Sequence, residues 1–387
     1  MARSPLWGRR IHLAGSIHGD ALIATSHEVS RAREYVRVLV KALMKLGATF
    51  VVPVDAEKLR EDGLPICFDW LIWETINQNL SSRPADAPSP LVVAVKHHKN
   101  EEQIPPQFSD LWQAMRRSAL VRIESAAHWD MNAKRMEAQA RHGDILITLG
   151  GGEGVEFLAN LYHDAGKPVI PLNFKLSPRD FGSQKIYDFG LSGRNSQRLF
   201  QTQGSVDSHS YLNRIEITPT KALTEAVEDT VDLLQDLVAP RAFVVRLLAT
   251  GHPDYSAVQE FFDTVVQPVM ENELGYELTV VNGKQRYDHS RIDQEIFEKL
   301  HRSAVVVADV TGARPNCFIE LGYALGRGLH TVLLAREGTE HPFDITSFAA
   351  HHWSSTGSAE DRRRGFREHW DAIKLRPALV QMEPLIP

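Results

Sequence analysis

Cysteine is scarce in this chain, which has only two, Cys67 and Cys317. A disulfide framework is therefore not expected, and a reducing compartment such as the cytoplasm fits the composition. The chain also lacks an apolar run of about 18 residues, which a membrane-spanning helix needs. Its first ten residues are partly basic, but no apolar stretch follows them as in a signal peptide. We therefore expect a cytoplasmic protein without a membrane partner.

A large excess of either charge is absent as well. The formal net charge is −6, so neither nucleic acid nor an anionic membrane is expected as the main partner. Metal-ligand spacing is missing too. The pairs His97-His98 and His351-His352 have no third ligand at a usual distance, and we interpret both as surface or loop histidines. We expect no metal site and no required cofactor.

The 387 residues suffice for two domains, each with its own core. Buried-strand and amphipathic-helix patterns alternate twice along the chain, which is typical of parallel sheets covered by helices. We predict an α/β protein with two Rossmann-like or flavodoxin-like parallel-sheet domains in series. The stretch Val238-Ala239-Pro240 ends a helical pattern and sets the boundary, giving domains 1–239 and 240–387.

The elements expected in the first domain follow from apolar periodicity and turn residues. The strands are Arg10–Gly15, Thr49–Pro53, Leu91–Val95, Asp144–Leu149 and Pro168–Leu172. The helices are His27–Leu46, Ser109–Met115, Asp130–Ala140, Val155–Ala165 and Thr220–Leu237, with Trp70, Trp73 and Ile76 spaced as core residues of a further one. The polar, glycine-containing stretch Ser177–Asn213 is predicted to be a long loop or an assembly element.

The second domain shows the same alternation in a shorter length. Strands are expected at Ala242–Ala249, Glu277–Val281, Ala304–Ala308 and Thr331–Ala335. Helices are expected at Ser256–Leu274 and Ser290–His301, between Pro315 and Gly328, and in the charged stretch after Trp353.

Four glycines stand within five positions at the end of the strand Asp144–Leu149. Glycine lets the backbone approach a ligand closely, and the start of the next helix offers free N–H groups to an anion. The end of the first strand can supply further donors beside it. The alternative is a tight turn without a ligand. The predicted phosphate or signal-binding residues are Gly15, Ser16, Gly150, Gly151, Gly152, Glu153 and Gly154.

This glycine-rich segment resembles the SLOG superfamily of Rossmannoid domains, which includes lysine-decarboxylase-like phosphoribohydrolases and nucleotide-ligand sensors. Its hallmark is Gly-Gly-x-Gly-Thr followed closely by two glutamates. Here Val155 replaces the threonine, and Phe157 and Leu158 replace the glutamates. The resemblance covers about Arg9 to Asn173. It implies a sensor that keeps the phosphate loop and has lost the hydrolytic site; residual hydrolysis of nucleoside monophosphates is the alternative.

Two carboxylates and an amide gather at one strand end in the second domain. Asp309 follows the apolar run Ala304–Ala308, Asn316 stands in the turn that opens the next helix, and Glu320 lies in that helix's first two turns. A carboxylate beside the anomeric carbon can act as nucleophile or electrostatic partner when an N-glycosidic bond breaks. We predict that Glu320 is catalytic and that Asp309 and Asn316 orient the sugar.

Three further residues are predicted to contact the substrate: Tyr255, Arg246 and Tyr323. The structural alternative to the catalytic interpretation stays open. Asp309 could merely bond the turn that follows it, and Asn316 could be only an N-cap. Helical spacing places Phe318, Leu321, Gly322 and Leu325 on the buried side and Glu320 nearly opposite, as for a solvated residue. Cys317 is more easily explained as a small packed residue than as a reactive thiol.

The second domain resembles the nucleoside 2-deoxyribosyltransferase-like and TIR-like group over about Arg241 to Trp353. The pattern is carried by Ala308-Asp309-Val310-Thr311-Gly312, Arg314-Pro315-Asn316, Glu320-Leu321-Gly322-Tyr323-Ala324 and Pro342-Phe343-Asp344-Ile345. In that group the glutamate that matches Glu320 is the catalytic residue of nucleoside, nucleotide or NAD glycosidases. The resemblance therefore implies a glycosidase with Glu320 at its centre.

Together the two resemblances imply a sensor–effector protein of bacterial antiphage immunity. A nucleotide-derived ligand would activate it, NAD+ would be its substrate, and nicotinamide and ADP-ribose its products in abortive infection. Such effectors work as homo-oligomers or filaments. The alternatives are an ungated nucleotide or deoxynucleotide N-glycosidase, a nucleoside 2-deoxyribosyltransferase, and a nucleotide-sensing module without catalysis.

Overall fold

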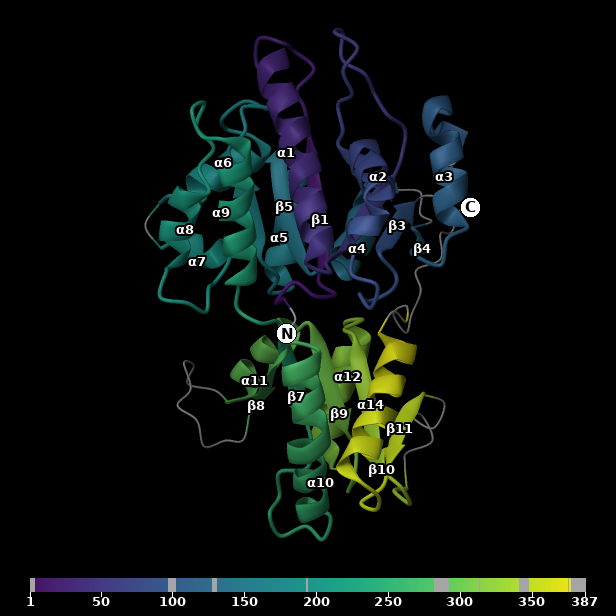
Figure 1. Cartoon of the computed structure of the whole chain (residues 1–387). Helices are drawn as coiled ribbons and strands as arrows, with labels where there is room; N and C mark the ends of the chain where they lie inside the picture. Colours follow the sequence, from purple (N-terminus) through teal and green to yellow (C-terminus); the bar gives the residue numbers. More distant parts are fainter. Residues whose placement is uncertain are drawn as a thin grey trace. The chain divides into compact units, whose positions relative to one another are not determined.

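The computed structural model describes residues 4–96, 102–126, 131–192, 194–281, 292–312, 314–340, 348–374 and 376. The chain divides into two compact units, the first ending at Val238 and the second beginning at Ala239. Each unit is a parallel β-sheet with helices packed on it (Figure 1), so the predicted fold class is confirmed. His97-His98 and Pro342–Ile345 of the sequence motifs lie outside the described residues.

Unit 1 contains a six-stranded parallel sheet in the order β4-β3-β2-β1-β5-β6. Its strands are β1 Arg10–Ser16, β2 Thr49–Val54, β3 Val92–Lys96, β4 Val121–Ser125, β5 Ile145–Gly150 and β6 Val169–Leu172. Its α-helices are α1 Ser26–Lys45, α2 Asp69–Gln78, α3 Ser109–Arg116, α4 Met131–His142, α5 Glu153–Asp164, α6 Gly182–Gly190, α7 Ser196–Leu199, α8 Ser208–Arg214 and α9 Leu223–Gln235. The strand order reverses between β1 and β5, and ligands bind at such a point in open α/β sheets.

Both faces of this sheet are covered, which explains the continuous apolar runs of its strands. In β5, Ile145, Ile147 and Leu149 belong to the large core that includes residues of α1 and α9. Leu146 points the other way and packs with Leu158 of α5. The alternation fixes which residues reach the crevice at the carboxyl ends of the strands.

Local signals set the limits of α1. The Thr25 side chain accepts a hydrogen bond from the Glu28 N–H at 3.3 Å, which caps the first turn. Buried side chains then recur at helical spacing along one face. Gly47, at φ +76°, reverses the chain after the last turn. The helix was therefore readable from the sequence.

The expectation of a long loop at Ser177–Asn213 is wrong, because this stretch forms α6, α7 and α8. Its few apolar residues are placed to join the core: Tyr187, Leu199, Phe200, Tyr211 and Leu212 are all buried. Each helix is too short to show a clear period in the sequence. Strand β4 was not expected either, since it is a partly exposed edge strand with charged residues at alternate positions.

Unit 2 contains a five-stranded parallel sheet in the order β11-β10-β9-β7-β8. Its strands are β7 Arg241–Val245, β8 Glu277–Val280, β9 Val305–Asp309, β10 Thr331–Arg336 and β11 Ala350–Trp353. Its helices are α10 Tyr255–Phe261, α11 Ile292–His301, α12 Pro315–Gly326 and α14 Ala359–Ile373, with the π-helical segments η4 Phe262–Val266 and η5 Pro268–Glu273 after α10. This is the flavodoxin-like order, and it reverses between β7 and β9.

The two faces of the second sheet carry different helices. Val306 and Ala308 of β9 pack with residues of α11 and α12. Val305 and Val307 pack with residues of α10, η4, η5 and α14. Because side chains alternate along a strand, Asp309 belongs to the face of Val305 and Val307.

The predicted helix Ser256–Leu274 is present, but it is α-helical only as far as Phe261. Pro268 lacks the N–H that would bond the carbonyl of Thr264 in an α-helix. The Arg363 side chain of α14 donates to that carbonyl instead, at 2.7 Å. Arg363 therefore ties α14 to η4.

Strand β11 was not expected from the sequence. His351 and His352, expected as surface or loop histidines, both lie in this edge strand, where His352 is exposed and His351 is half-buried. Trp353, the last residue of β11, is only 2% exposed. Among the described residues, no helix is long and apolar enough to cross a membrane.

Candidate active site

Glu320 lies in the second turn of α12, and its side chain is half-buried. No described residue gives it a hydrogen bond or an ion pair. Burial alone raises its pKa from 4.5 to about 7. Helical spacing predicted a solvated Glu320 opposite a buried Gly322, whereas Gly322 is exposed and the buried face is formed by Cys317, Leu321 and Ala324. A titratable carboxyl without a partner is thus left beside the sheet edge.

Asp309 is fully buried at the carboxyl end of β9. Its Oδ1 accepts from the Thr311 backbone N–H at 3.0 Å, and its Oδ2 accepts from the Trp353 indole N–H at 2.7 Å. Burial raises its pKa to about 6, although these hydrogen bonds oppose the shift. Both oxygens are therefore engaged, and Asp309 fixes the turn that leads into α12.

Asn316 and Tyr323 lie on the same helix but differ in surroundings. Asn316 is exposed at the second position of α12, and Arg314 occupies the N-cap, so the N-cap interpretation of Asn316 is wrong. The Tyr323 hydroxyl hydrogen-bonds His301 Nδ1 at 2.8 Å. The Tyr323 ring lies 5.0 Å from that of Phe297, so its contacts are with α11 and not with Asp309.

Arg246 directly follows β7, on the other side of the strand-order reversal from Asp309. Its guanidinium lies over the Phe262 ring, 5.0 Å from the ring centre. Burial lowers the pKa of Arg246, while the charges of Asp263, Tyr255 and Asp309 oppose this. Arg246 therefore lies within electrostatic range of both Asp309 and Tyr255, which begins α10.

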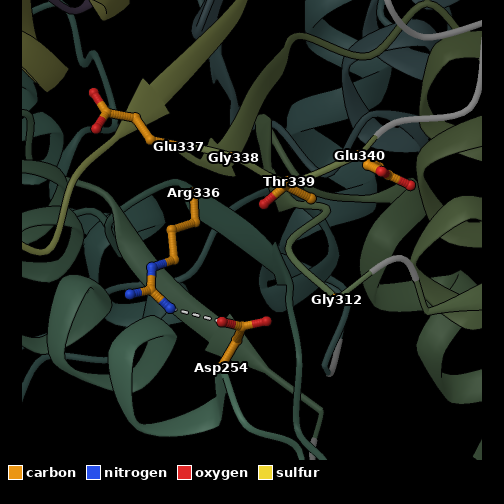
Figure 2. Close-up of a pocket in the computed structure, with 7 residues that line it drawn as sticks. All are labelled: Asp254, Gly312, Arg336, Glu337, Gly338, Thr339 and Glu340. Atoms are coloured by element: carbon orange, nitrogen blue, oxygen red, sulfur yellow. Dashed lines mark hydrogen bonds and ion pairs between the residues drawn. The ribbon is translucent and has the colours of Figure 1, made fainter.

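An open pocket of about 360 Å³ lies at this sheet edge. Its lining comes from the loop after β7, the turn after β9 and the end of β10: Asp254, Gly312, Arg336, Glu337, Gly338, Thr339 and Glu340. Figure 2 shows the Arg336 side chain reaching Asp254, with a separation of 2.6 Å. The Arg336 backbone N–H also donates to the Thr311 hydroxyl at 2.9 Å. The sequence analysis did not identify this pair. In the sequence, Arg336 is marked only by its position at the end of β10, and Asp254 only by its position before α10.

Cys317 lies within electrostatic range of both carboxyl groups. It is 6% exposed, and burial raises its pKa to about 12, with the charges of Glu320 and Asp309 adding to the shift. The thiol is therefore a packed, neutral group, as expected. It also lies within electrostatic range of Glu320, on the helix that covers one face of the sheet, and of Asp309, which points to the other.

In unit 1 the glycine-rich loop meets the end of β1, as expected. Ser16 pairs with Gly150 in the sheet, and the Gly151 N–H donates to the Ser16 carbonyl at 2.7 Å. A Cβ at Gly15 would lie 1.9 Å from the Leu149 carbonyl oxygen, so only glycine fits there. A Cβ on Gly152, in contrast, would meet nothing within 4 Å. This side of the loop is open.

Acidic groups stand close to the glycines. Glu153 is exposed in the first turn of α5. Glu156 accepts from the Gly182 N–H at 2.9 Å and pairs with Lys185 at 2.6 Å, which holds the start of α6 against the loop. Glu156 is therefore a structural clamp in this chain, and Glu153 faces solvent beside Gly154.

Unit 1 also contains a carboxyl with a strongly raised pKa, which the sequence analysis did not identify. Asp69 begins α2, and burial raises its pKa to about 7, with Asp55 and Glu57 adding to the shift and Arg135 opposing it. The adjacent Cys67 pairs with Ser16 in an isolated bridge. Nothing in the local sequence distinguishes Asp69 from an ordinary first-turn acid. Within the described ranges, no group of His, Cys, Asp and Glu is arranged to hold a metal ion.

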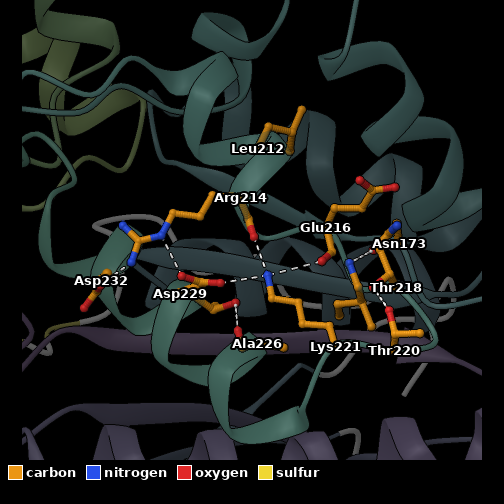
Figure 3. Close-up of polar contacts among 12 residues, drawn as sticks. Asn173, Leu212, Arg214, Glu216, Thr218, Thr220, Lys221, Ala226, Asp229 and Asp232 are labelled. Carbon is orange, nitrogen blue, oxygen red and sulfur yellow. Dashed lines mark hydrogen bonds and ion pairs between the residues drawn. The ribbon is translucent and has the colours of Figure 1, made fainter.

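The segment between α8 and α9 is held by a polar network (Figure 3). Lys221 pairs with Asp229 at 2.7 Å and also donates to the Arg214 carbonyl. Arg214 pairs with Asp229 at 2.6 Å and with Asp232 at 2.7 Å. Arg31 of α1 donates to the carbonyls of residues 218 and 221. The segment between α8 and α9, which directly follows the stretch predicted as a loop, is therefore fixed to α1 and α9.

Comparison with known proteins places unit 1 in a family. The model described as ATP nucleosidase Cap17-like, N-terminal, matches residues 6–234, which is more than half of the chain. The chain belongs to this family. The family match contains the glycine-rich loop and Asp69. It ends before unit 2, so Glu320, Asp309 and Arg246 lie outside it.

Two curated relatives agree with this assignment. ATP nucleosidase Cap17 from Escherichia coli strain KTE188 is 24% identical over 153 residues, which are 38% of this chain and 29% of that protein. A second ATP nucleosidase Cap17 from Escherichia coli has the same identity and coverage. The chain therefore matches less than a third of the length of these relatives.

Proposed function

We propose that this chain is a nucleotide N-glycosidase in which unit 2 cleaves the glycosidic bond and unit 1 binds a nucleotide-derived signal. The observation that carries the proposal is the half-buried Glu320 carboxyl, whose pKa burial raises to about 7 and which has no partner among the described residues. Such groups at the ends of parallel strands are candidates for acid, base or nucleophile. A pKa near the working pH is also what efficient proton or charge catalysis requires.

In the proposed reaction the ionised Glu320 faces the anomeric carbon as the bond to the base breaks. The bond's electron pair leaves with the base, positive charge develops on the sugar, and the carboxylate stabilises this charge or bonds to the anomeric carbon. Water then adds to that carbon, frees the carboxylate and releases a proton to solvent. Asp309 acts as a positioning residue, because both its oxygens are engaged. Asn316, exposed one turn before Glu320, is proposed to bind a sugar hydroxyl.

NAD+ is the proposed substrate. Its nicotinamide ring carries a positive charge and leaves as a neutral molecule, so no acid is needed to protonate it. Among the described carboxyls near this edge, Glu320 is the half-buried one without a partner, since Asp309 is engaged, Asp254 pairs with Arg336, and Glu337 and Glu340 are exposed to solvent. A single free carboxylate fits a leaving group that requires no proton.

ATP is the second candidate, and the family membership favours it, since the relatives are ATP nucleosidases. Adenine needs protonation as it leaves. The acid would be a group not yet identified at this edge. Because the match lies in unit 1, the relatives' substrate is carried to this chain only as a proposal.

The gating part of the proposal assigns the open side of the Gly150–Gly154 loop to a nucleotide signal, at the point where the strand order of unit 1 reverses. Binding there would activate unit 2, in a homo-oligomer or filament, as in an antiphage response. No further cofactor is required in this scheme. The acidic Glu153 beside the loop makes a signal with exposed hydroxyls or a base better suited than free phosphate.

The test incubates purified chain with NAD+, ATP and nucleoside monophosphates, with and without ADP-ribose or cyclic nucleotides, and measures released base by chromatography. Glu320→Gln is expected to lower release about a hundredfold or more. Glu277→Gln, an exposed glutamate at the opposite edge of the sheet, should leave it unchanged. Adenine release from ATP without nicotinamide release from NAD+ would replace the substrate. Undiminished release by Glu320→Gln would refute the site.

A further inference from the structure

The position of Arg246 follows from the strand before it. Val244 of β7 packs on the face of α10, η4 and α14, and Arg246, two residues later, returns to that face, where its guanidinium meets Phe262. Asp309, at the end of the neighbouring β9, projects to the same face. Arg246 therefore lies at the point where the strand order reverses and where a ligand of unit 2 is expected.

Two buried donors of the Arg246 guanidinium have no acceptor in the part of the chain that the structure describes. These are Nε and Nη1, and neither has a hydrogen-bond partner there. The two nearby carboxylates are engaged elsewhere: Asp309 accepts from Thr311 and Trp353, and Asp263 accepts from Gln259 at 2.8 and 2.9 Å. Arg246 as a whole is half-buried, but unsatisfied buried donors are costly, and such groups in native proteins call for an explanation.

We propose that Arg246 is the anchor for a phosphate of the substrate, so that unit 2 accepts phosphorylated nucleotides in preference to free nucleosides. A guanidinium presents paired donors that match two phosphate oxygens, and an aromatic ring under it fixes its plane. The 5′-phosphate or pyrophosphate of a nucleotide supplies the missing acceptors. This inference rests on the proposed function, because it takes a nucleotide as the ligand of unit 2. It does not depend on how Glu320 cleaves that nucleotide.

The experiment compares two probes that differ in phosphate, NAD+ and nicotinamide riboside. Calorimetric titration uses the Glu320→Gln chain, so that neither probe is consumed. Adding Arg246→Lys, which keeps the charge but loses the paired donors, should weaken one NAD+ binding event about tenfold to a hundredfold. Binding of nicotinamide riboside should change less than about twofold. Arg302→Lys, an exposed residue paired with Glu298 at the end of α11, is the matched control and should change neither.

The outcomes separate this inference from the proposed function. Equal weakening of both probes by Arg246→Lys overturns the phosphate anchor, because the residue would then only support the crevice. If Arg246→Lys weakens only NAD+ binding, and the chain with Glu320 intact cleaves no nucleotide, the phosphate anchor is supported and the proposed glycosidase activity is refuted. A second arm needs no variant: inorganic pyrophosphate should compete with NAD+ for the Glu320→Gln chain. Absence of competition at millimolar concentration refutes the anchor even if Arg246→Lys fails to fold.

Discussion

Two carboxyl groups of unit 2 have raised pKa values for the same reason but differ in what they can do. Burial raises the pKa of Asp309 to about 6 and that of Glu320 to about 7. Asp309 is held through both oxygens, so protonating or moving it would disturb the turn at Thr311. The Glu320 carboxyl accepts no hydrogen bond from a described residue. At the scale of single residues, the partners of a group distinguish a structural acid from a reactive one.

The raised pKa of Glu320 has a consequence for stability. The folded chain binds a proton at Glu320 more tightly than the unfolded chain, so this group lowers the free energy of unfolding as pH rises from about 4.5 to 7. Glu320→Gln removes the penalty and should stabilise unit 2 at pH 8 by about 1 kcal/mol, after allowance for partial solvent exposure. At pH 4 the variant should match the parent. Urea unfolding at both pH values measures this, and equal stability at pH 8 would contradict a buried Glu320.

The same pKa predicts the pH dependence of catalysis. If ionised Glu320 stabilises the sugar cation, kcat/KM for NAD+ rises with pH and levels off above a midpoint near 7. Initial rates between pH 5 and 9 provide the measurement. A rate that falls as pH rises through 7 would show that protonated Glu320 is the active form and would exchange its role from nucleophile to acid.

At the scale of elements, the strand–helix–strand stretch from Ala304 to Ala335 was predictable because its signals are local. An apolar run makes β9, Pro315 stands at the first position of α12, and Gly328 takes φ +66° just after its end. These signals also placed Asp309 at the carboxyl end of β9 and Glu320 in the second turn of α12. The orientation of Tyr323 was not predictable, because it depends on His301 of another helix.

Where elements depend on distant partners, the sequence was a poor guide. The short helices α6 to α8 are held by clamps such as Glu156 to Gly182 and by the network around Lys221. Strand β11 is tied to the end of β9 by Trp353 and Asp309, 44 residues apart in the chain. Neither pattern has a local period. The same holds for Asp69, whose pKa is raised first by burial and then by the charges of Asp55 and Glu57 on another segment.

The start of α6 offers a test of this long-range dependence. Gly182 has φ +57°, and a Cβ there would lie 2.4 Å from the carbonyl oxygens of Gly150 and Gly151. Gly182→Ala should therefore destabilise unit 1 by about 2–4 kcal/mol, through backbone strain and displacement of α6. Gly152→Ala, where a Cβ has open space, should cost less than about 1 kcal/mol. Chemical unfolding measures both, and equal costs would refute the tight seat of α6.

At the scale of the whole molecule, the two units have separate cores. The large cluster of unit 1 contains residues up to Leu237, and the clusters of unit 2 begin at Ala242. Each unit also has its own reversal of strand order and its own titratable carboxyl at that edge. The chain thus has two candidate ligand sites of similar architecture, one within the family match and one outside it.

Separate cores predict separate unfolding. Differential scanning calorimetry should resolve two transitions, because chains of several domains depart from two-state behaviour. Trp353→Phe leaves the buried Asp309 without one donor and should lower only the unit 2 transition, by an amount equivalent to about 1–3 kcal/mol. Gly182→Ala should lower only the other. A single transition that both variants shift together would show that the units unfold as one.

The purely parallel pairing of these sheets also governs how the chain is made. Every neighbouring pair of strands is joined by a crossover, and the pair that forms the unit 1 crevice, β1 and β5, is separated by more than a hundred residues. During synthesis, Ser16 of β1 can therefore pair with Gly150 of β5 only after Gly150 has left the ribosome. The corresponding strands of unit 2, β7 and β9, are closer together in the sequence. Loop closure over such distances is slow. The delay between synthesis of the first strand and completion of the sheet should therefore be longer in unit 1 than in unit 2. Unit 1 is thus the part whose incomplete sheet is exposed to chaperone binding for longest.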